Sequence, residues 1–330
     1  MNTQANNNNA GQNHGENIGL KIRQFIEDYF IILVLLLLVM FFSLSSDHFF
    51  SLATLSTLLN QLPALTVVTV GMTLVLISGG IDLSVGSIMA LSAGIIGVLA
   101  TSFSLPLPVA ALLGIVAGAA AGLFNGYLTS YFTLPAFIVT LGMLEAARGL
   151  AYLTTGSQTI YIGYSIQKMA LPLPYIGISV AMIIALLIVA LAHFTLTRTV
   201  FGRYIIAMGT NETAARISGI NTKPYLAIVL MISGALAGLA GLFNAAYLGS
   251  ADPNAGLGLE LSAIAAAVIG GTSLMGGRGS ILGAFTGVLI IAVLQNGLAQ
   301  MGVSEPTKRL ITGLVIVAAV LIDRWRSHQH

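Results

Sequence analysis

The chain alternates between long apolar runs and short polar segments, and the runs have the length of membrane-spanning helices. A helix needs about 20 mostly apolar residues to cross a bilayer. We expect such helices at roughly 29–45, 61–77, 86–101, 107–128, 136–155, 173–195, 225–248, 261–271, 280–300 and 308–322. The run at 261–271 is too short to cross alone, so it is either a half-helix or extends through 256–260. The pattern predicts an all-α polytopic membrane protein with about ten transmembrane helices.

The two ends of the chain differ from the apolar middle. Residues 1–24 begin with an Asn- and Gln-rich stretch that contains almost nothing to bury, which predicts a disordered tail. The membrane domain then covers 25–326, and 327–330 form a C-terminal tail. Basic residues gather on one side of the predicted spans, at Lys21, Arg23, Arg198, Arg203, Arg216, Lys223, Arg278, Arg324 and Arg326, whereas Lys168, Lys308 and Arg309 fall on the other. This bias predicts that both termini are cytoplasmic.

The composition agrees with a lipid environment. The chain is 56% hydrophobic and 7% charged, with a mean hydropathy of +0.94, whereas soluble domains are about 25% charged. The net charge of +2 is too small to indicate nucleic-acid binding. The chain has no cysteine, so neither a disulfide framework nor thiolate chemistry is available.

The motifs of ATP hydrolysis and of metal catalysis are missing from the sequence. A phosphate-binding loop needs a Gly-Lys-Ser/Thr string, and none of Lys21, Lys168, Lys223 and Lys308 follows a glycine. The histidines form no His-Glu-x-x-His pair, and there is no cysteine ligand. We therefore expect no catalytic residue, no metal site and no cofactor bound by this chain.

Asp82, Glu145 and Arg148 are the only candidates for a charge buried within the membrane. A charge at the centre of a bilayer costs roughly 2.5–3.5 kcal/mol, so it is usually paired or functional. Glu145 and Arg148 are three residues apart on one helix and can neutralise each other, which favours a structural pair over a substrate contact. Asp82 either caps a helix that starts near Ser84 or takes part in transport.

Glycines have two expected uses. Gly114, Gly118 and Gly122, and the pair Gly234 and Gly238, are spaced for close helix packing. Residues 79–86 and 270–277 resemble each other, and so do 125–126 and 296–297, which is the pattern of broken helices in the two halves of a transporter. The spacing between the two matches is unequal, so a true repeat stays an open alternative.

Several neutral residues in or near the spans suit the path of a sugar, which needs hydrogen-bonding groups and aromatic faces. They are Asn125, Phe137, Thr140, Asn244 and Asn296. Ordinary interhelical hydrogen bonding explains each one taken alone equally well or better.

A charged segment at about 196–224 interrupts the apolar runs. Asn211 can cap a short helix that runs through Ser218 and ends at Gly219. Such a helix either sits in a groove of a soluble partner or lies in the lipid interface, held by its arginines. The two interpretations have equal support from the residues alone.

Strings along nearly the whole chain after about Phe25 resemble one transporter family. They include Gly-Ile-Asp-Leu-Ser-Val-Gly-Ser at 80–87 and Val-Ile-Gly-Gly-Thr-Ser-Leu at 268–274, together with 71–75, 137–141, 148–149, 202–204, 209, 211–212, 215–216, 218–221, 260–261, 264–266 and 276–277. In these strings the chain resembles the permease subunits of bacterial ABC sugar importers, specifically the ribose-type branch.

The resemblance implies a set of partners and sites. Two permease copies, as a homodimer, would form the pathway in the bacterial inner membrane. A periplasmic binding protein would deliver a monosaccharide, by default ribose. A separate cytoplasmic ATPase would use ATP and Mg and dock at Gly209, Asn211, Glu212, Ala215, Arg216 and Gly219. The pathway or gate would lie near Gly79, Gly80, Asp82, Ser84, Asn125, Phe137, Thr140, Gly270, Gly271 and Ser273.

Two other classes of protein fit the sequence less well. An ion-coupled secondary sugar or polyol carrier usually has intramembrane carboxylates, and one paired Glu and one possible cap are few. An intramembrane enzyme needs a nucleophile–base pair or a metal cluster within a span, and the sequence shows neither.

Overall fold

The computed structural model describes residues 31–46 and 49–327, and within them the chain is built almost entirely of helices. A helix lies at each of the ten predicted positions. The helices are Ile31–Ser45, α2 (Leu52–Ile77), α3 (Val85–Thr101), α4 (Leu107–Tyr131), α5 (Ala136–Thr155), α7 (Val180–Arg198), α10 (Thr222–Leu248), α11 (Leu259–Ile269), α12 (Ile281–Gln300) and α13 (Glu305–Ser327). Within the described residues, six are long and apolar enough to cross a membrane, namely the 54–77 part of α2, α4, α5, α7, α10 and α12. The protein is therefore an all-α, multi-pass membrane protein.

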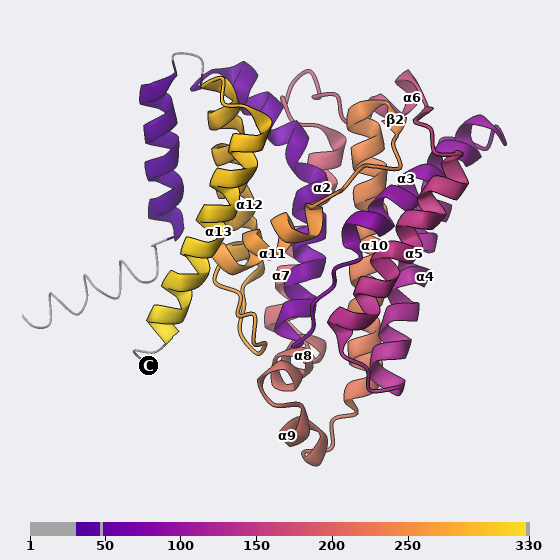
Figure 1. Ribbon diagram of the computed structural model, residues 1–330, viewed down its shortest axis with the longest axis vertical. Coiled ribbons are helices and arrows are strands. Elements are labelled where there is room, and N and C mark those ends of the chain that lie inside the picture. The colour runs from indigo at the N-terminus through magenta and orange to yellow at the C-terminus, as the bar shows by residue number, and fades with distance from the viewer. Residues whose placement is uncertain (1–30, 47–48, 328–330) are drawn as a thin grey trace, which may run out of the picture.

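Short elements mark the two ends of the helix bundle (Figure 1). One end carries α8 (Val200–Thr210) and α9 (Glu212–Ile217), and we call it the α9 end. The other end carries α6 (Tyr164–Gln167) and the antiparallel pair β1 (Ile160–Tyr161) and β2 (Ser250–Ala251), and we call it the ribbon end. The C-terminal end of α13 lies toward the α9 end.

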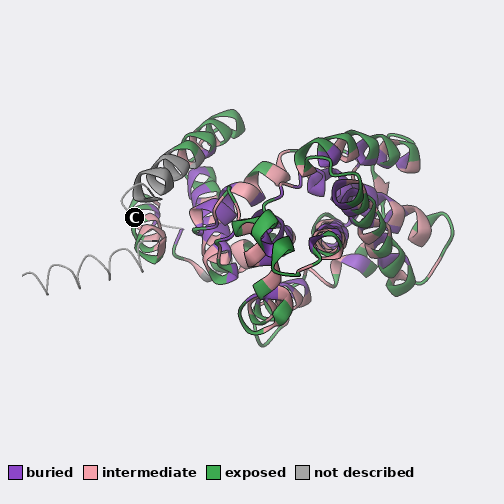
Figure 2. Cartoon of the chain, turned by 90° about the horizontal axis from the view of Figure 1, so that it is seen from below, coloured by how far each residue is buried: buried purple, intermediate pink, exposed green. Residues whose placement is uncertain are grey.

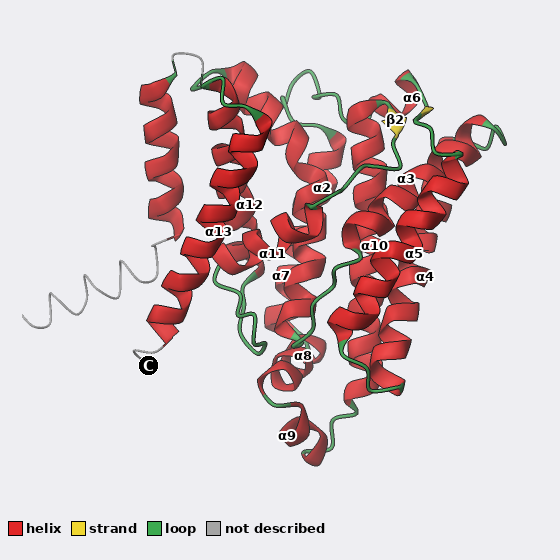
Figure 3. Cartoon of the chain, in the orientation of Figure 1, coloured by secondary structure: helices red, strands yellow, loops and turns green. Residues whose placement is uncertain are grey.

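Two of the helices are interrupted inside the bundle. After α2 the chain turns back at the α9 end and rises as a non-helical segment, 79–84, to the start of α3; Figure 3 shows this loop beside α10. After β2 the segment 252–258 descends from the ribbon end to the start of α11. At about 1.5 Å per residue, the 17 residues of α3 and the 11 of α11 span roughly 26 Å and 17 Å, less than a hydrocarbon core of about 30 Å.

The short predicted run at 261–271 forms a half-helix. The other prediction, a helix that extends back through 256–260, is wrong for most of that stretch. Gly256 and Gly258 have positive φ angles of 74° and 82°, a conformation that a right-handed helix does not contain. The helix accordingly begins at Leu259.

Close packing of α4 on α10 depends on glycine. A Cβ atom at Gly118 would lie 3.0 Å from the Cα atom of Gly238, and one at Gly122 would lie 3.0 Å from the Cα atom of Gly234. The carbonyl oxygens of Gly234 and Leu230 would lie closer still, at 2.5 Å or less, which is too short for a real Cβ atom, so glycine allows the two backbones to approach this closely. The prediction that these glycines serve helix packing is confirmed.

Large apolar side chains remain exposed on the outside of the bundle. They include Leu112 on α4, Leu153 on α5 and Leu187 on α7. Figure 2 shows exposed residues along the outer helices and buried ones inside. Lipid can cover an apolar surface of this kind in a membrane protein.

Replacing Gly122 by alanine should lower the stability of the protein by about 1–3 kcal/mol, because the new Cβ overlaps α10. Thermal unfolding of the detergent-purified protein measures the change. Gly313→Ala on α13 is the control, since nothing lies within 4 Å of a Cβ there. Equal melting temperatures for the two variants would contradict the packing role.

Candidate functional site

Asp82 lies at the centre of a buried hydrogen-bond network in the first interrupted segment. Its Oδ1 atom accepts from the backbone N–H of Ser84 at 3.0 Å and from the Ser84 hydroxyl at 2.6 Å, and its Oδ2 atom accepts from the Ser233 hydroxyl at 2.8 Å. Asn125 donates through Nδ2 to the Ser84 Oγ atom at 3.0 Å. Asp82, Ser84 and Asn125 have no exposed surface. Asp82 thus bonds to Ser84, the residue before α3, and joins this segment to α10, but it accepts from no free N–H of α3 itself, so the capping alternative is not realised.

Thr140 on α5 holds the same segment from another side. Its hydroxyl donates to the carbonyl of Ile81 at 3.1 Å and accepts from the backbone N–H of Leu83 at 3.1 Å. These are backbone groups that no helix satisfies, and in a membrane they need protein partners. Phe137, one turn earlier on α5, is 50% exposed; its carbonyl lies 3.3 Å from the Thr140 Oγ1 atom, but its side chain makes no part of this network. Four predicted site residues therefore meet here, and Phe137 lies apart from them.

Arg148 holds the second interrupted segment, and the predicted pair with Glu145 is wrong. The Nη1 atom of Arg148 donates to the carbonyls of Pro253 at 2.5 Å and Ala255 at 2.8 Å. Glu145 is exposed on another face of α5, and the two side chains form no ion pair. Tyr152 adds a hydrogen bond of 2.7 Å from its Oη atom to the Oδ1 atom of Asn254. The guanidinium takes the carbonyls because they lack helical partners.

A cavity of about 780 Å³ lies between α2, α10, α11, α12 and α13. Its polar lining consists mainly of neutral side chains: Gln61, Asn244, Tyr247, Ser262, Gln295, Asn296 and Thr312. Met89 on α3 and Gly256 line its inner part. The predicted residues Asn244 and Asn296 are in this cavity, whereas Asn125 and Thr140 are in the buried network. Sequence reasoning missed Gln61 and Gln295, because each belongs to a short polar pair within or beside an apolar run, and the run alone does not show what the pair faces.

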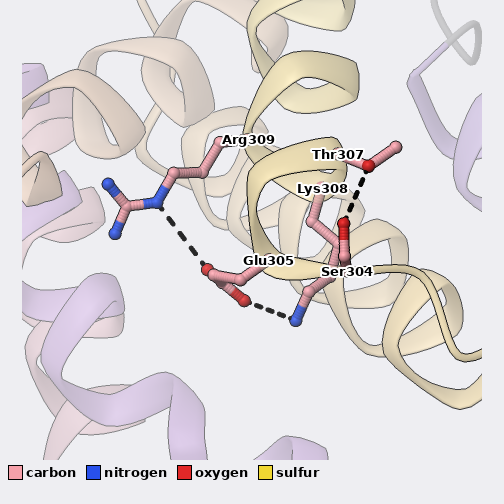
Figure 4. A network of polar contacts seen from close by, with 5 residues as sticks. All are labelled: Ser304, Glu305, Thr307, Lys308 and Arg309. Atoms are coloured by element: carbon pink, nitrogen blue, oxygen red, sulfur yellow. Dashed lines mark hydrogen bonds and ion pairs between the residues drawn. The ribbon is translucent and has the colours of Figure 1, made fainter.

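Charged residues form the rim of the cavity at the ribbon end (Figure 4). Glu305 pairs with the Nζ atom of Lys308 at 2.6 Å and lies 3.8 Å from the Nε atom of Arg309. The hydrogen bond from Lys308 holds the pKa of the Glu305 carboxyl below its ordinary value. Lys308 and Arg309 thus belong to a local charge cluster, which explains their position on the side opposite to most basic residues.

The short helix α9 forms as predicted at the far end of the molecule. The Asn211 Oδ1 atom accepts from the backbone N–H of Ala214 at 2.9 Å, which caps the helix. Gly219 follows its end with a φ angle of +87°. Arg216 and Ile217 are exposed, Ile217 by 83%, whereas Ala215 is buried against the bundle. Of the predicted docking residues, Ala215 therefore presents no surface to a partner, and Ile217 is an addition.

Glycine turns connect α8 to both interrupted regions. A Cβ atom at Gly276 would lie 2.7 Å from the Gly209 carbonyl oxygen and 3.0 Å from the Cα atom of Gly79. The backbone N–H of Gly277 donates to the carbonyl of Ile77 at 2.9 Å. The end of α8 is thus packed between the turn after α2 and the loop after α11.

The remaining predicted pathway glycines have structural surroundings. Gly80 packs on the side chains of Val75 and Ala136, and Gly270 packs on the backbone of Gly283. Gly271 has a φ angle of +84° in the loop after α11, where the Ser273 hydroxyl accepts from the N–H of Met275 at 3.1 Å. None of Gly270, Gly271 and Ser273 lines the cavity.

The internal similarity is only partly structural. The segments 79–86 and 270–277 both begin at turns at the α9 end. Residues 125–126 lie near the α9 end of α4, however, while 296–297 lie near the ribbon end of α12. The second match therefore does not continue the first.

Two interrupted helices around a polar cavity, with an exposed short helix at one end, define a membrane transport subunit. Residues 54–320 match the family described as the branched-chain amino acid transport system / permease component, and the chain belongs to this family. It is a transporter subunit, and the ATPase of such a system is a separate subunit.

The chain is similar to several curated permeases over most of its length. It is 38% identical over 303 residues to the ribose import permease protein RbsC of Escherichia coli (strain K12), which covers 88% of this chain and 92% of the relative. It is 40% identical over 296 residues to RbsC of Bacillus subtilis (strain 168), covering 89% and 91%. It is 36% identical over 304 residues to the fructose import permease protein FrcC of Rhizobium meliloti, covering 89% and 84%. No solved structure matches. The predicted family resemblance is confirmed.

Replacing Ser233 by alanine should destabilise the protein by about 1–3 kcal/mol, because the buried Asp82 Oδ2 atom loses its donor. Thermal unfolding of the purified permease checks this value. Ser130→Ala is the matched control, since the Ser130 hydroxyl bonds only to the Gly126 carbonyl of its own helix, at 2.6 Å. A larger loss for Ser130→Ala than for Ser233→Ala would show that the network contributes little.

Proposed function

We propose that this chain is the membrane subunit of an ATP-driven importer of a monosaccharide such as ribose. The cavity carries the proposal: its volume is in the range of ligand sites, about 300–1,000 Å³, and its neutral polar lining suits a carbohydrate. The relatives named for ribose and fructose import support the same substrate class. The cavity is the outer part of the sugar path, and it ends where α3 and α11 meet.

The α9 end faces the cytoplasm, and both termini lie on that side. The exposed basic residues Arg203, Arg216 and Arg278 at this end support the orientation. The ten helices are then the membrane segments. The non-helical segments 79–84 and 252–258, which precede α3 and α11, complete the crossing of these two short helices. The ribbon end, where the cavity has its charged rim, receives the sugar from a periplasmic binding protein.

A cytoplasmic ATPase binds at α9, and ATP and Mg are bound by that ATPase. The exposed pair Arg216 and Ile217 gives this surface both charge and apolar area, which is typical of a helix that inserts into a groove. Movement of α9 passes through α8 to Gly209 and from there to the packed turns at Gly79 and Gly276. The two interrupted helices then shift together, and the path alternates between its two openings.

A second copy of the chain packs against α5. The outer face of this helix carries the exposed Glu145 between Gly142 and Gly149, and nothing lies within 4 Å of a Cβ at either glycine. An isolated charge facing lipid costs roughly 2.5–3.5 kcal/mol, and small residues allow another helix to approach closely. Each subunit would then keep its own cavity, instead of sharing one path at the dimer interface.

Reconstitution tests the function. Proteoliposomes that hold this chain, its ATPase and its binding protein should take up labelled ribose only with ATP, and omission of either partner should abolish uptake. Uptake without ATP that follows an ion gradient would instead favour the secondary carrier. If ribose is not taken up, stimulation of the ATPase across a panel of sugars identifies the cargo.

Asn244→Leu should slow ATP-dependent uptake by about tenfold, because one hydrogen bond to the sugar is lost in the cavity. The ATPase should still co-purify with this variant. Gln158→Leu, at an exposed position outside the cavity, is the control and should transport normally. Normal uptake by Asn244→Leu, together with loss in Phe137 variants on α5, would move the path to the dimer interface.

Arg216→Glu should reduce co-purification of the ATPase severalfold and leave membrane insertion intact, because the charge of the docking surface is reversed. Arg203→Glu, on α8 at the same end of the bundle, is the control for the change in net charge. Retention of the ATPase by Arg216→Glu at the wild-type level would remove α9 from the docking surface.

A further inference from the structure

The cavity ends where the N-terminal ends of the two half-helices touch. A Cβ atom at Gly256 would lie 2.6 Å from the Gly86 carbonyl oxygen and 2.8 Å from the Cε atom of Met89. Met89 and Gly256 both line the cavity, and Gly86 is buried directly behind them. We call this contact of Gly86, Met89 and Gly256 the floor of the cavity.

One side of the floor has little backbone structure of its own. Gly256 belongs to the non-helical segment 252–258, whose Pro253 and Ala255 carbonyls both accept from the Nη1 atom of Arg148. Arg148 is 8% exposed and lies on α5, more than 100 residues away in the sequence. Its guanidinium therefore replaces the hydrogen bonds that a continuous helix would supply.

The other side of the floor is attached to the same helix. Thr140 on α5 bonds to the backbone of Ile81 and Leu83, in the segment that leads into α3. Eight residues separate Thr140 from Arg148, which is about 12 Å along the helix axis. The rigid α5 thus sets the spacing between the two segments whose ends form the floor.

We propose that Arg148 is a positioning residue that keeps the floor closed until the ATPase acts. This inference rests on the proposed function, because it takes the cavity as the sugar path. With Arg148 in place, 252–258 presses Gly256 against Gly86, and sugar cannot pass. Loss of the side chain frees two carbonyls, loosens 252–258 and lets sugar leak through without ATP.

The test measures passive loss of labelled ribose from loaded proteoliposomes that hold the complex without ATP. Arg148→Met should raise this leak by about tenfold or more, the change that follows from loss of one charge-assisted hydrogen bond. Arg148→Lys should stay close to wild type, since an ammonium group can still donate to both carbonyls. A role in folding alone would lower the yield of protein and would not open a leak.

A second variant and a control keep the test decisive if Arg148→Met does not fold. Gly256→Ala places a Cβ against the Gly86 carbonyl and Met89 and should leak as well. Thr155→Val on α5 loses a hydroxyl that bonds within its own helix, at 2.9 Å to the Ala151 carbonyl, and should stay tight. Tight, fully coupled transport by both Arg148→Met and Gly256→Ala would overturn the proposal.

Thiol labelling separates this inference from the function on which it rests. The chain contains no cysteine, so a single reporter can be placed above the floor at Ser262 or below it at Ile81. A membrane-impermeant maleimide added from the ribbon side should label Ser262→Cys in every background, and Ile81→Cys only when Arg148 is also Met. If Ile81→Cys stays unlabelled when Arg148 is Met, Arg148 does not keep the floor closed, whichever sugar is the cargo. If the labelling is as expected but no sugar is taken up, only the proposed function is refuted.

Discussion

The structure depends on one constraint: backbone polar groups inside a membrane must find partners within the protein. Two segments, 79–84 and 252–258, cross the interior of the bundle without helical hydrogen bonds. Side chains from other helices meet the constraint. Thr140 bonds to the first segment, Arg148 bonds to the second, and Asp82 joins the start of α3 to Ser233 on α10. The polar residues of the bundle interior are therefore explained first by the interrupted backbone, and only then by a substrate.

A second feature of the structure is the close approach of backbones, which glycine allows. The same residue type brings α4 onto α10 at Gly122 and Gly234, allows α3 to meet 252–258 at Gly86, and packs α8 between two turns at Gly209. In the first case the result is a rigid wall. In the other two it is a contact between backbone segments of different elements, and these contacts can separate without withdrawing a side chain from a packed pocket. A permease that alternates between two openings needs both kinds of contact.

The sequence predicted the helices well and their polar partners poorly, and the reason is physical. Apolar length and periodicity are local properties, so each of the ten runs became a helix, and the short run at 261–271 became a half-helix. Asn211 caps α9 as expected, because a cap also acts over three residues. Arg148 was assigned to Glu145, its nearest opposite charge in the sequence, but its partners lie 105 and 107 residues away. Gln61 and Gln295 were missed for the same reason, since a polar residue in an apolar run indicates a cavity only once the facing helices are known.

The separation of the cavity from the buried network bears on how such a subunit can be selective and still release its cargo. Asp82, Ser84 and Asn125 are bonded to one another and have no exposed surface, so none of them is open to a sugar in this arrangement. Apart from the charged rim, the polar side chains of the cavity are neutral, and several, such as Asn244, are only partly buried. In the proposed path the contacts to a sugar are weak and neutral, whereas the contacts of the buried network behind it are strong and fixed. This arrangement suits a subunit that obtains affinity from a separate binding protein and energy from a separate ATPase. In this arrangement, α5 is the element that belongs to both parts, because its two polar side chains hold the interrupted segments on which the cavity ends.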